Sequence, residues 1–215
     1  MKTGGIRFPK QIRVIRQLAK DNPAGMLHVT DLKRNYFMTT KKICLTAIGT
    51  ALFVVLPLCL QVPVFENYYL CLGYTVMMVF CFYFGPISSV IVGSLGVFLY
   101  CLLISGLRGM PGWAMGNIVI ALSVSLACRF TAGLANRRLR HLILAVVIVA
   151  STAVAIIGVK SVVEMLLYTQ PFLLRAAKNI YAFVADVFVM VLSLPICDNL
   201  GNIVRKLFPD EITIR

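Results

Sequence analysis

The sequence predicts an all-α, polytopic membrane protein: a bundle of six transmembrane helices with both termini in the cytoplasm. Of its 215 residues, 60% are hydrophobic and only 13% are charged, and the mean hydropathy is +0.88. Soluble domains carry about 25% charged residues. The charges crowd into the first forty residues and a few short segments, leaving apolar runs that approach the roughly 20 residues a spanning helix needs. These runs lack the two-residue alternation of barrel strands, so we expect helices.

Residues 1–42 form a basic N-terminal segment that we expect on the cytoplasmic side. They hold ten of the 21 Lys and Arg residues and lack the apolar core of a signal peptide. Two interpretations stay open for Lys10–Lys20: a short basic helix on an anionic membrane surface, or a solvated tail. Residues 43–200 are the predicted membrane domain, and residues 201–215 a short cytoplasmic tail.

Six charge-poor runs give the predicted spans. Pro63–Tyr69 and Phe172–Lys178 are expected to be loops, and Asn136–Arg140 a basic turn. Gly85-Pro86 separates the second span from the third, because proline suits the first turn of a helix. The expected helices cover Ile43–Val62, Tyr68–Phe84, Pro86–Leu107, Trp113–Cys128, Leu142–Tyr168 and Asn179–Cys197.

The distribution of Lys and Arg predicts the orientation. Seventeen of the 21 fall on the side of the termini, and the other four are Arg108, Lys160, Arg175 and Lys178. Cytoplasmic loops of membrane proteins carry the excess of positive charge. This accounts for the net charge of +13 better than nucleic-acid binding does, so we expect no nucleic-acid partner.

The sequence contains no recognisable catalytic or metal-binding set. Its seven Cys residues lie in or beside apolar runs without CxxC spacing, and His28 and His141 both fall on the basic side. The outer face offers no Ser-His or Cys-His pairing, and the chain has neither an HExxH motif nor a Walker A loop. We therefore expect a non-enzymatic protein without a metal or other cofactor.

The stretch Leu103–Asn117 is the first candidate for a ligand site. It contains the only Trp, Trp113, and a lone cation, Arg108, between two long apolar runs. We interpret it as a lid at the rim of an outer pocket, although Trp113 also suits an interfacial aromatic belt. Asn117 falls one helical turn after Trp113, where it can contact a ligand or link helices.

Polar residues in the last two predicted spans face the same outer side. Charges within spans are costly and usually face the bundle interior or a wet cavity. Lys160 and Glu164 share a helix face, where they can pair with each other or contact a ligand. Asn179 opens the last predicted helix, as a cap or a ligand contact, and Asp186 can balance Lys160.

Small residues in the first span predict a packing face. Ala47 and Ala51 are four residues apart, so they share a face where another helix can approach closely. The pattern is weak by itself, and intramolecular packing explains it equally well.

These features together resemble the S components of energy-coupling factor (ECF) transporters, in particular the riboflavin/hydroxymethylpyrimidine-type branch. The resemblance covers about residues 40–200. It rests on six helices, the basic N-terminus, Ala47-x-x-x-Ala51, Phe84-Gly85-Pro86 followed by Gly93, and the segment from Val163 through Tyr168 to Asn179.

The resemblance implies a substrate-specific subunit of an importer in the bacterial plasma membrane. Such a subunit binds a vitamin or precursor at the outer face and works with an ECF transmembrane subunit and two ATPase subunits. The first-helix motif, here Ala47 and Ala51, would dock on the transmembrane subunit. The implied ligand contacts are Glu66, Asn67, Arg108, Trp113, Asn117, Lys160, Glu164 and Asn179.

Two other functions remain open at this point. One is a membrane assembly or scaffold protein whose polar residues serve helix packing alone. The other is a self-sufficient secondary carrier, although the sequence shows no obvious inverted repeat.

Overall fold

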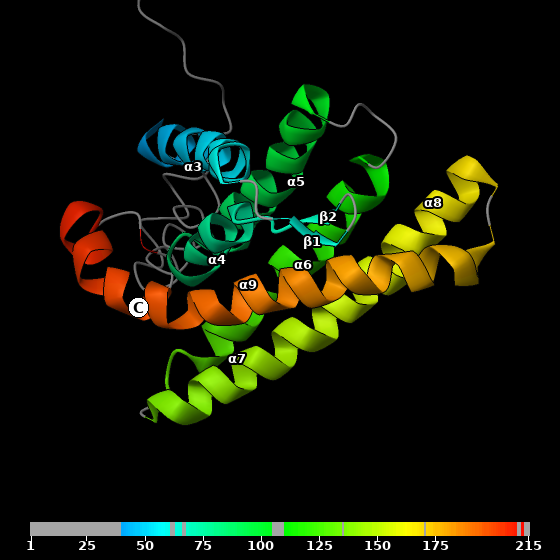
Figure 1. The fold of residues 1–215 in the computed structure, drawn as a ribbon. Coiled ribbons are helices and arrows are strands. Elements are labelled where there is room, and N and C mark those ends of the chain that lie inside the picture. The colour runs from blue at the N-terminus through cyan, green and yellow to red at the C-terminus, as the bar shows by residue number, and fades with distance from the viewer. Residues whose placement is uncertain are drawn as a thin grey trace, which may run out of the picture. The chain divides into compact units, whose positions relative to one another are not determined.

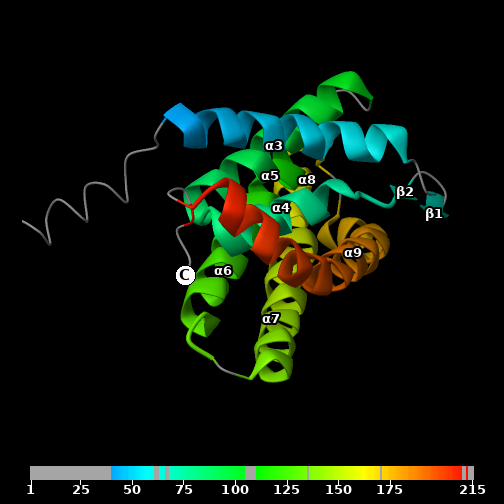
Figure 2. The same cartoon turned by 90° about the vertical axis from the view of Figure 1, so that its left-hand side faces the viewer.

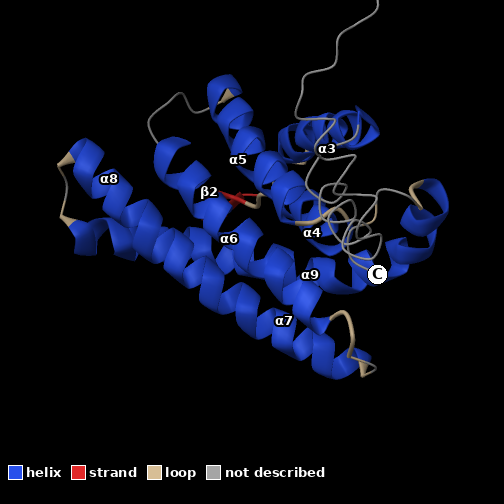
Figure 3. Ribbon diagram, turned by 180° about the vertical axis from the view of Figure 1, so that it is seen from behind, coloured by secondary structure: helices blue, strands red, loops and turns tan. Residues whose placement is uncertain are grey.

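The computed structural model describes residues 40–60, 63–65, 68–104, 110–134, 136–169, 171–209 and 212. All of the described residues belong to the part of the chain that begins at Thr40. This part is almost entirely helical (Figure 3), so the predicted all-α membrane bundle is confirmed. The predicted basic helix over Lys10–Lys20 lies outside the described residues.

Five helices of the described residues are long and apolar enough to cross a membrane. A sixth, α4, spans only Gly73–Tyr83, 11 residues. At 1.5 Å per residue it is about 16 Å long, roughly half of a 30 Å hydrocarbon core. The predicted count of six is therefore approximate. The five long spans are α3 (Thr40–Cys59), α5 (Pro86–Leu103), α6 (Met110–Thr131), a continuous helical rod (Arg137–Tyr168) and α9 (Phe172–Leu207).

A small hairpin replaces the predicted loop over Pro63–Tyr69 and the start of the predicted second helix. β1 (Pro63–Phe65) pairs antiparallel with β2 (Tyr68–Tyr69), and its register is irregular between Pro63 and Phe65. The prediction of a helix from Tyr68 was wrong because β-pairing satisfies this backbone before α4 begins at Gly73. The hairpin and α4 together connect α3 to α5.

Local capping chemistry explains two boundaries. Gly85, at φ 86°, adopts a conformation that favours glycine, and Pro86 then begins α5. Asn136 caps α7 (Arg137–Thr152), since its side-chain oxygen accepts hydrogen bonds from the amides of Arg138 and Leu139 at 3.1 and 3.4 Å. The prediction that Asn136–Arg140 is a turn before a helix at Leu142 was therefore wrong, because the helix starts at the cap.

The predicted fifth helix is a rod made of three pieces. α7 passes into an eight-residue π-helix, η1 (Ala153–Lys160), and then into α8 (Ser161–Tyr168). The rod ends at Thr169, which has a left-handed backbone with φ 53°. π-Helical turns are rare and are frequently found at functional sites, and this one ends at Lys160, a candidate site residue.

The last helix is much longer than predicted. α9 begins at Phe172, directly after Pro171, and continues to Leu207 with Pro195 inside it. The expected loop Phe172–Lys178 is helical, and the expected end at Cys197 is ten residues short of Leu207. Its charged residues suggested a loop, but in the structure they lie on the first turns of α9, where Lys178 is exposed and Arg175 is partly buried beside Glu164.

The bundle has two ends that carry polar residues. α5 packs against α3, α4 and α6, and α6 also packs against α7 and η1 (Figures 1 and 2). α9 contacts α4, α7, η1 and α8. The α8 end consists of the last turns of α5 and α8 and the first turns of α6 and α9. The Asp198 end consists of the last turns of α4, α6 and α9 and the first turns of α7.

Candidate ligand-binding site

The α8 end holds a hydrogen-bonded chain that joins three helices. Trp113, in the first turn of α6, donates its indole N–H to the hydroxyl of Tyr74 on α4 at 2.8 Å. That hydroxyl donates to the side-chain oxygen of Asn117 at 2.8 Å, and the Asn117 amide donates to the carbonyl of Gly93 on α5 at 3.0 Å. Asn117 and Tyr74 are fully buried. The orientation of Trp113 is thus set by buried partners.

Aromatic rings surround this chain. The ring of Tyr100 meets Trp113 edge-on, with centroids 5.8 Å apart and planes at 86°. Phe53 meets Tyr74 in a similar arrangement at 6.0 Å and 72°. Edge-to-face pairs of this kind are favourable beyond the area that they bury. Trp113 therefore packs into the bundle, in addition to lying near one end of it.

Lys160 joins this cluster from the rod. Its Nζ lies 6.0 Å from the centre of the Trp113 ring, within the range of a cation–π contact. The close approach of η1 and α6 depends on glycine. A Cβ on Gly112 would lie 3.1 Å from the Lys160 carbonyl oxygen, and one on Gly116 would lie 3.2 Å from that of Ala155. These two glycines, four residues apart, let the π-helix pack directly on α6.

A second polar cluster links α8 to α9. Asn179 donates to the Ser161 hydroxyl at 3.0 Å and to Glu164 Oε2 at 3.4 Å. Arg175 Nη1 lies 3.8 Å from the same carboxylate oxygen, and its guanidinium lies 5.6 Å from the centre of the Tyr168 ring. The Glu164 side chain is buried, so its charge is held by Arg175 and the Asn179 amide.

Asp186 lies deeper on α9 and is buried. The expectation that Asp186 balances Lys160 stays a prediction.

The structure groups the described site residues into these two clusters. Trp113, Asn117 and Lys160 belong to the first, and Glu164 and Asn179 to the second. Among the described residues, Glu164 forms its ion pair with Arg175 and not with Lys160. The possible role of Asn179 as a helix cap is excluded, because α9 begins seven residues earlier, at Phe172. Glu66, Asn67 and Arg108 lie outside the described residues.

Sequence reasoning missed several partners of these residues. Tyr74 and Tyr100 were not singled out, although a Tyr hydroxyl inside an apolar helix usually finds a partner. Arg175 entered only the charge balance, because its segment was expected to be a loop. Ser161 gave no signal at all, since serine is common in helices that pack in membranes.

The two predicted docking residues lie on the opposite surface of α3 from its core contacts. Ala47 and Ala51 are exposed, whereas the face containing Gly49 and Phe53 is buried. A Cβ on Gly49 would come within 2.4 Å of the Phe80 ring, so the Gly49 face is in tight contact with α4. The Ala47 face is thus exposed within the described part of the chain.

Comparison with protein families identifies the chain. Residues 37–201, more than half of the chain, match the model of the family described as ECF-type riboflavin transporter, S component. The chain belongs to this family. It is therefore a substrate-specific membrane subunit of an ECF transporter, in a family of transport proteins and not of enzymes. A search of curated proteins finds no match.

The family match and the five apolar helices place this S component in a membrane. The polar side chains of the two clusters come from α4, α6, η1, α8 and α9, and they contact one another through hydrogen bonds, an ion pair and a cation–π contact. A ligand that binds there must exchange some of these internal contacts for its own.

Proposed function

We propose that this S component captures riboflavin, or a vitamin of similar shape, at the α8 end, which faces the outside of a bacterial plasma membrane. The observation that carries the proposal is the family match over residues 37–201, supported by the two polar clusters at that end. Hydroxymethylpyrimidine is the alternative ligand class.

The chemistry of the two clusters suits a flavin. Riboflavin combines a planar ring system, which stacks on aromatic side chains, with carbonyl groups and a polyol chain, which need hydrogen-bond partners. Trp113 and Tyr100 offer aromatic faces and edges, and Lys160 is a cation beside them. Glu164 and Asn179 supply an acceptor and an amide. Pockets for small molecules commonly combine apolar walls with a few such polar groups.

In this proposal Asn117 acts at the base of the site. Its side-chain oxygen accepts a hydrogen bond from the Tyr74 hydroxyl, and that hydroxyl accepts one from the Trp113 indole N–H. Glu66, Asn67 and Arg108 are further proposed contacts, and a closing movement of Leu103–Asn117 stays a prediction because residues 105–109 lie outside the described part.

A panel of vitamins tests the ligand assignment. Full-length protein purified in detergent is titrated with riboflavin, hydroxymethylpyrimidine and pantothenate, and binding is followed by calorimetry. We expect saturable riboflavin binding that is at least tenfold tighter than binding of the other two. Tighter binding of hydroxymethylpyrimidine would shift the assignment within the branch. Binding of none of the three would contradict it and would favour a scaffold role.

We further propose that the Ala47 face of α3 docks on an ECF transmembrane subunit that works with two ATPase subunits. The exposed alanines lie beside larger exposed side chains, Ile48 and Leu52, and small side chains at this spacing let a partner helix approach closely.

Replacing Ala47 by tryptophan tests docking separately from capture. We expect Ala47→Trp to bind vitamin within twofold of wild type but to lose most of its uptake when produced with the transmembrane subunit and the ATPases. Val146→Trp is the control, because Val146 is 62% exposed on a different helix, α7. Normal uptake by Ala47→Trp would show that the docking face lies elsewhere.

A further inference from the structure

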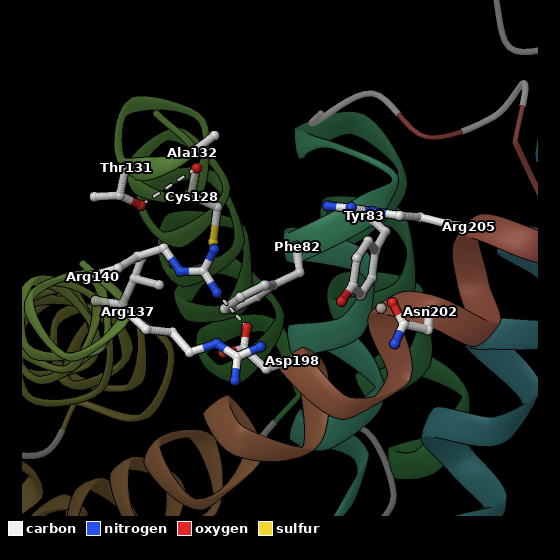
Figure 4. A pocket seen from close by; sticks show the side chains of 12 residues that line it. Phe82, Tyr83, Cys128, Thr131, Ala132, Arg137, Arg140, Asp198, Asn202 and Arg205 are labelled. Carbon is white, nitrogen blue, oxygen red and sulfur yellow. Dashed lines mark hydrogen bonds and ion pairs between the residues drawn. The ribbon is translucent and has the colours of Figure 1, made fainter. Parts of the chain in front are cut away.

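A cavity at the Asp198 end, far from the proposed vitamin site, has the chemistry of an anion site. It has a volume of about 190 Å³ and lies between the last turns of α4, α6 and α9 and the first turns of α7 (Figure 4). Liquid water takes about 30 Å³ per molecule, so the cavity has room for a group of phosphate size. Its polar lining consists mainly of Arg137, Arg140, Arg205, Asn202, Thr131 and Asp198.

The lining carries an excess of positive charge. Arg137 Nε lies 3.2 Å from Asp198 Oδ2, and Arg140 Nη2 pairs with the other oxygen of the same carboxylate. His141 Nε2 also contacts Asp198, at 2.9 Å. Three guanidinium groups therefore line a cavity in which Asp198 is the one carboxylate, so two positive charges remain without a counter-charge in the described lining.

Several donors around the cavity remain available. Arg140 Nε is buried and has no hydrogen-bond partner among the described residues. Arg205 forms no ion pair within the described part of the chain and lies with Asn202 across the cavity from Arg137 and Arg140 (Figure 4). An arginine side chain presents five N–H donors in a planar fork that matches the oxygens of a phosphate group. Guanidinium groups from two helices, α7 and α9, therefore line the same cavity and can donate to one phosphate group.

The cavity lies near the end of α6 and the start of α7, both of which belong to helices long and apolar enough to cross a membrane. Nearby side chains of the same helices, Phe130 and Leu142, are 84% and 64% exposed. Exposed apolar residues of this size suit contact with lipid tails. Basic pockets between spanning helices at the cytoplasmic side are suited to lipid head groups.

We propose that the cavity at the Asp198 end binds a phosphate-bearing anion through Arg137, Arg140, Arg205 and Asn202. Its source is either the head group of an anionic membrane lipid or a soluble phosphorylated compound. The site is separate from the vitamin site and does not depend on the identity of the vitamin.

Thermal unfolding of the full chain in detergent tests the proposal. Four probes are used: phosphatidylglycerol, diacylglycerol as the same lipid without phosphate, inorganic phosphate, and chloride at the same ionic strength. A ligand that binds the folded state and not the unfolded state raises the unfolding midpoint, and the rise grows with the ratio of ligand concentration to Kd. We expect phosphatidylglycerol or inorganic phosphate to raise the midpoint, and diacylglycerol and chloride to have no effect.

A matched pair of double variants assigns the effect to the cavity. Arg137→Gln with Arg205→Gln removes two cavity charges, while Arg138→Gln with Lys206→Gln removes two charges from neighbouring positions that do not line it. In the Arg137→Gln, Arg205→Gln variant, Asp198 still has Arg140 and His141 as partners. The unfolding midpoint of each double variant in the absence of any probe shows whether it folds. We expect at least a tenfold loss of apparent affinity in the first pair and less than a twofold change in the second.

Each outcome supports or overturns the site. A response to phosphatidylglycerol alone supports a lipid source, and a response to inorganic phosphate supports a soluble one. The proposal is overturned if neither probe shifts the midpoint, if diacylglycerol acts as strongly as phosphatidylglycerol, or if the two double variants lose affinity equally.

Discussion

At the scale of single residues, the polar groups inside this bundle are arranged as partners. Glu164 illustrates this, because its buried carboxylate is held by Arg175 and Asn179. Charges within spans are costly unless they are paired. The sequence indicated that Glu164 and Asn179 face one end of the bundle. It did not indicate their partners, because Arg175 and Ser161 become partners of Glu164 and Asn179 only through the packing of α8 against α9.

Replacing Arg175 by glutamine tests this pairing. Arg175→Gln leaves the Glu164 carboxylate with the Asn179 amide alone, so we expect a loss of about 1–2 kcal/mol in the free energy of unfolding. Lys178→Gln is the matched control, because Lys178 is exposed in the same region of α9, and it should change stability by less than about 0.5 kcal/mol. Denaturant unfolding in mixed micelles measures both, and equal stability of the two variants would contradict the pairing.

At the scale of elements, hydrophobic runs predicted where the long helices lie, but boundaries followed local chemistry. The cap at Asn136 makes α7 begin at Arg137 and not at the predicted Leu142. α9 begins at Phe172, directly after Pro171, and not at the predicted Asn179. The hairpin and the π-helix η1 gave no sequence signal, since backbone pairing and a change in helix winding leave no mark on hydropathy. However, Lys160 lies at the end of η1, beside Trp113. An element that the sequence did not predict therefore positions a site residue that the sequence did predict.

The contact between η1 and α6 gives a prediction at this scale. Gly116→Leu places a side chain against the Ala155 carbonyl, and overpacking of this kind costs about 1–3 kcal/mol. We expect a lower unfolding midpoint and weaker vitamin binding. Gly158→Leu is the control within η1 itself, because a Cβ there meets no atom within 4 Å, and it should leave both properties nearly unchanged. If Gly116→Leu has the same unfolding midpoint and vitamin affinity as Gly158→Leu, the close packing of η1 on α6 contributes to neither stability nor binding.

At the scale of the whole molecule, the two polar ends have different chemistry. The α8 end combines aromatic rings with mixed charges, and the Asp198 end is dominated by arginine. This division agrees with the orientation predicted from the excess of Lys and Arg near the termini. The predicted bundle, membrane class and family were all accessible from the sequence, because each depends on composition and on motifs that are local in the chain.

Reporter fusions test the orientation in cells. Alkaline phosphatase is active only outside the cytoplasm, whereas green fluorescent protein folds inside it. We expect fusions after Arg215 to fluoresce and to lack phosphatase activity, and fusions after Gln170 to show the reverse. Phosphatase activity after Arg215 would invert the bundle and would move the proposed vitamin site to the cytoplasmic face.

The central claim is that a vitamin of the riboflavin class binds beside Lys160 at the α8 end. The most direct measurement is a titration of the purified full-length chain with riboflavin, read by quenching of flavin fluorescence, for wild type, Lys160→Gln and Lys178→Gln. Each is measured well below its own unfolding midpoint. We predict saturable binding by wild type, at least a tenfold weaker affinity for Lys160→Gln, and less than a twofold change for Lys178→Gln. Equal affinities for the three proteins, or no binding by wild type, would contradict the account.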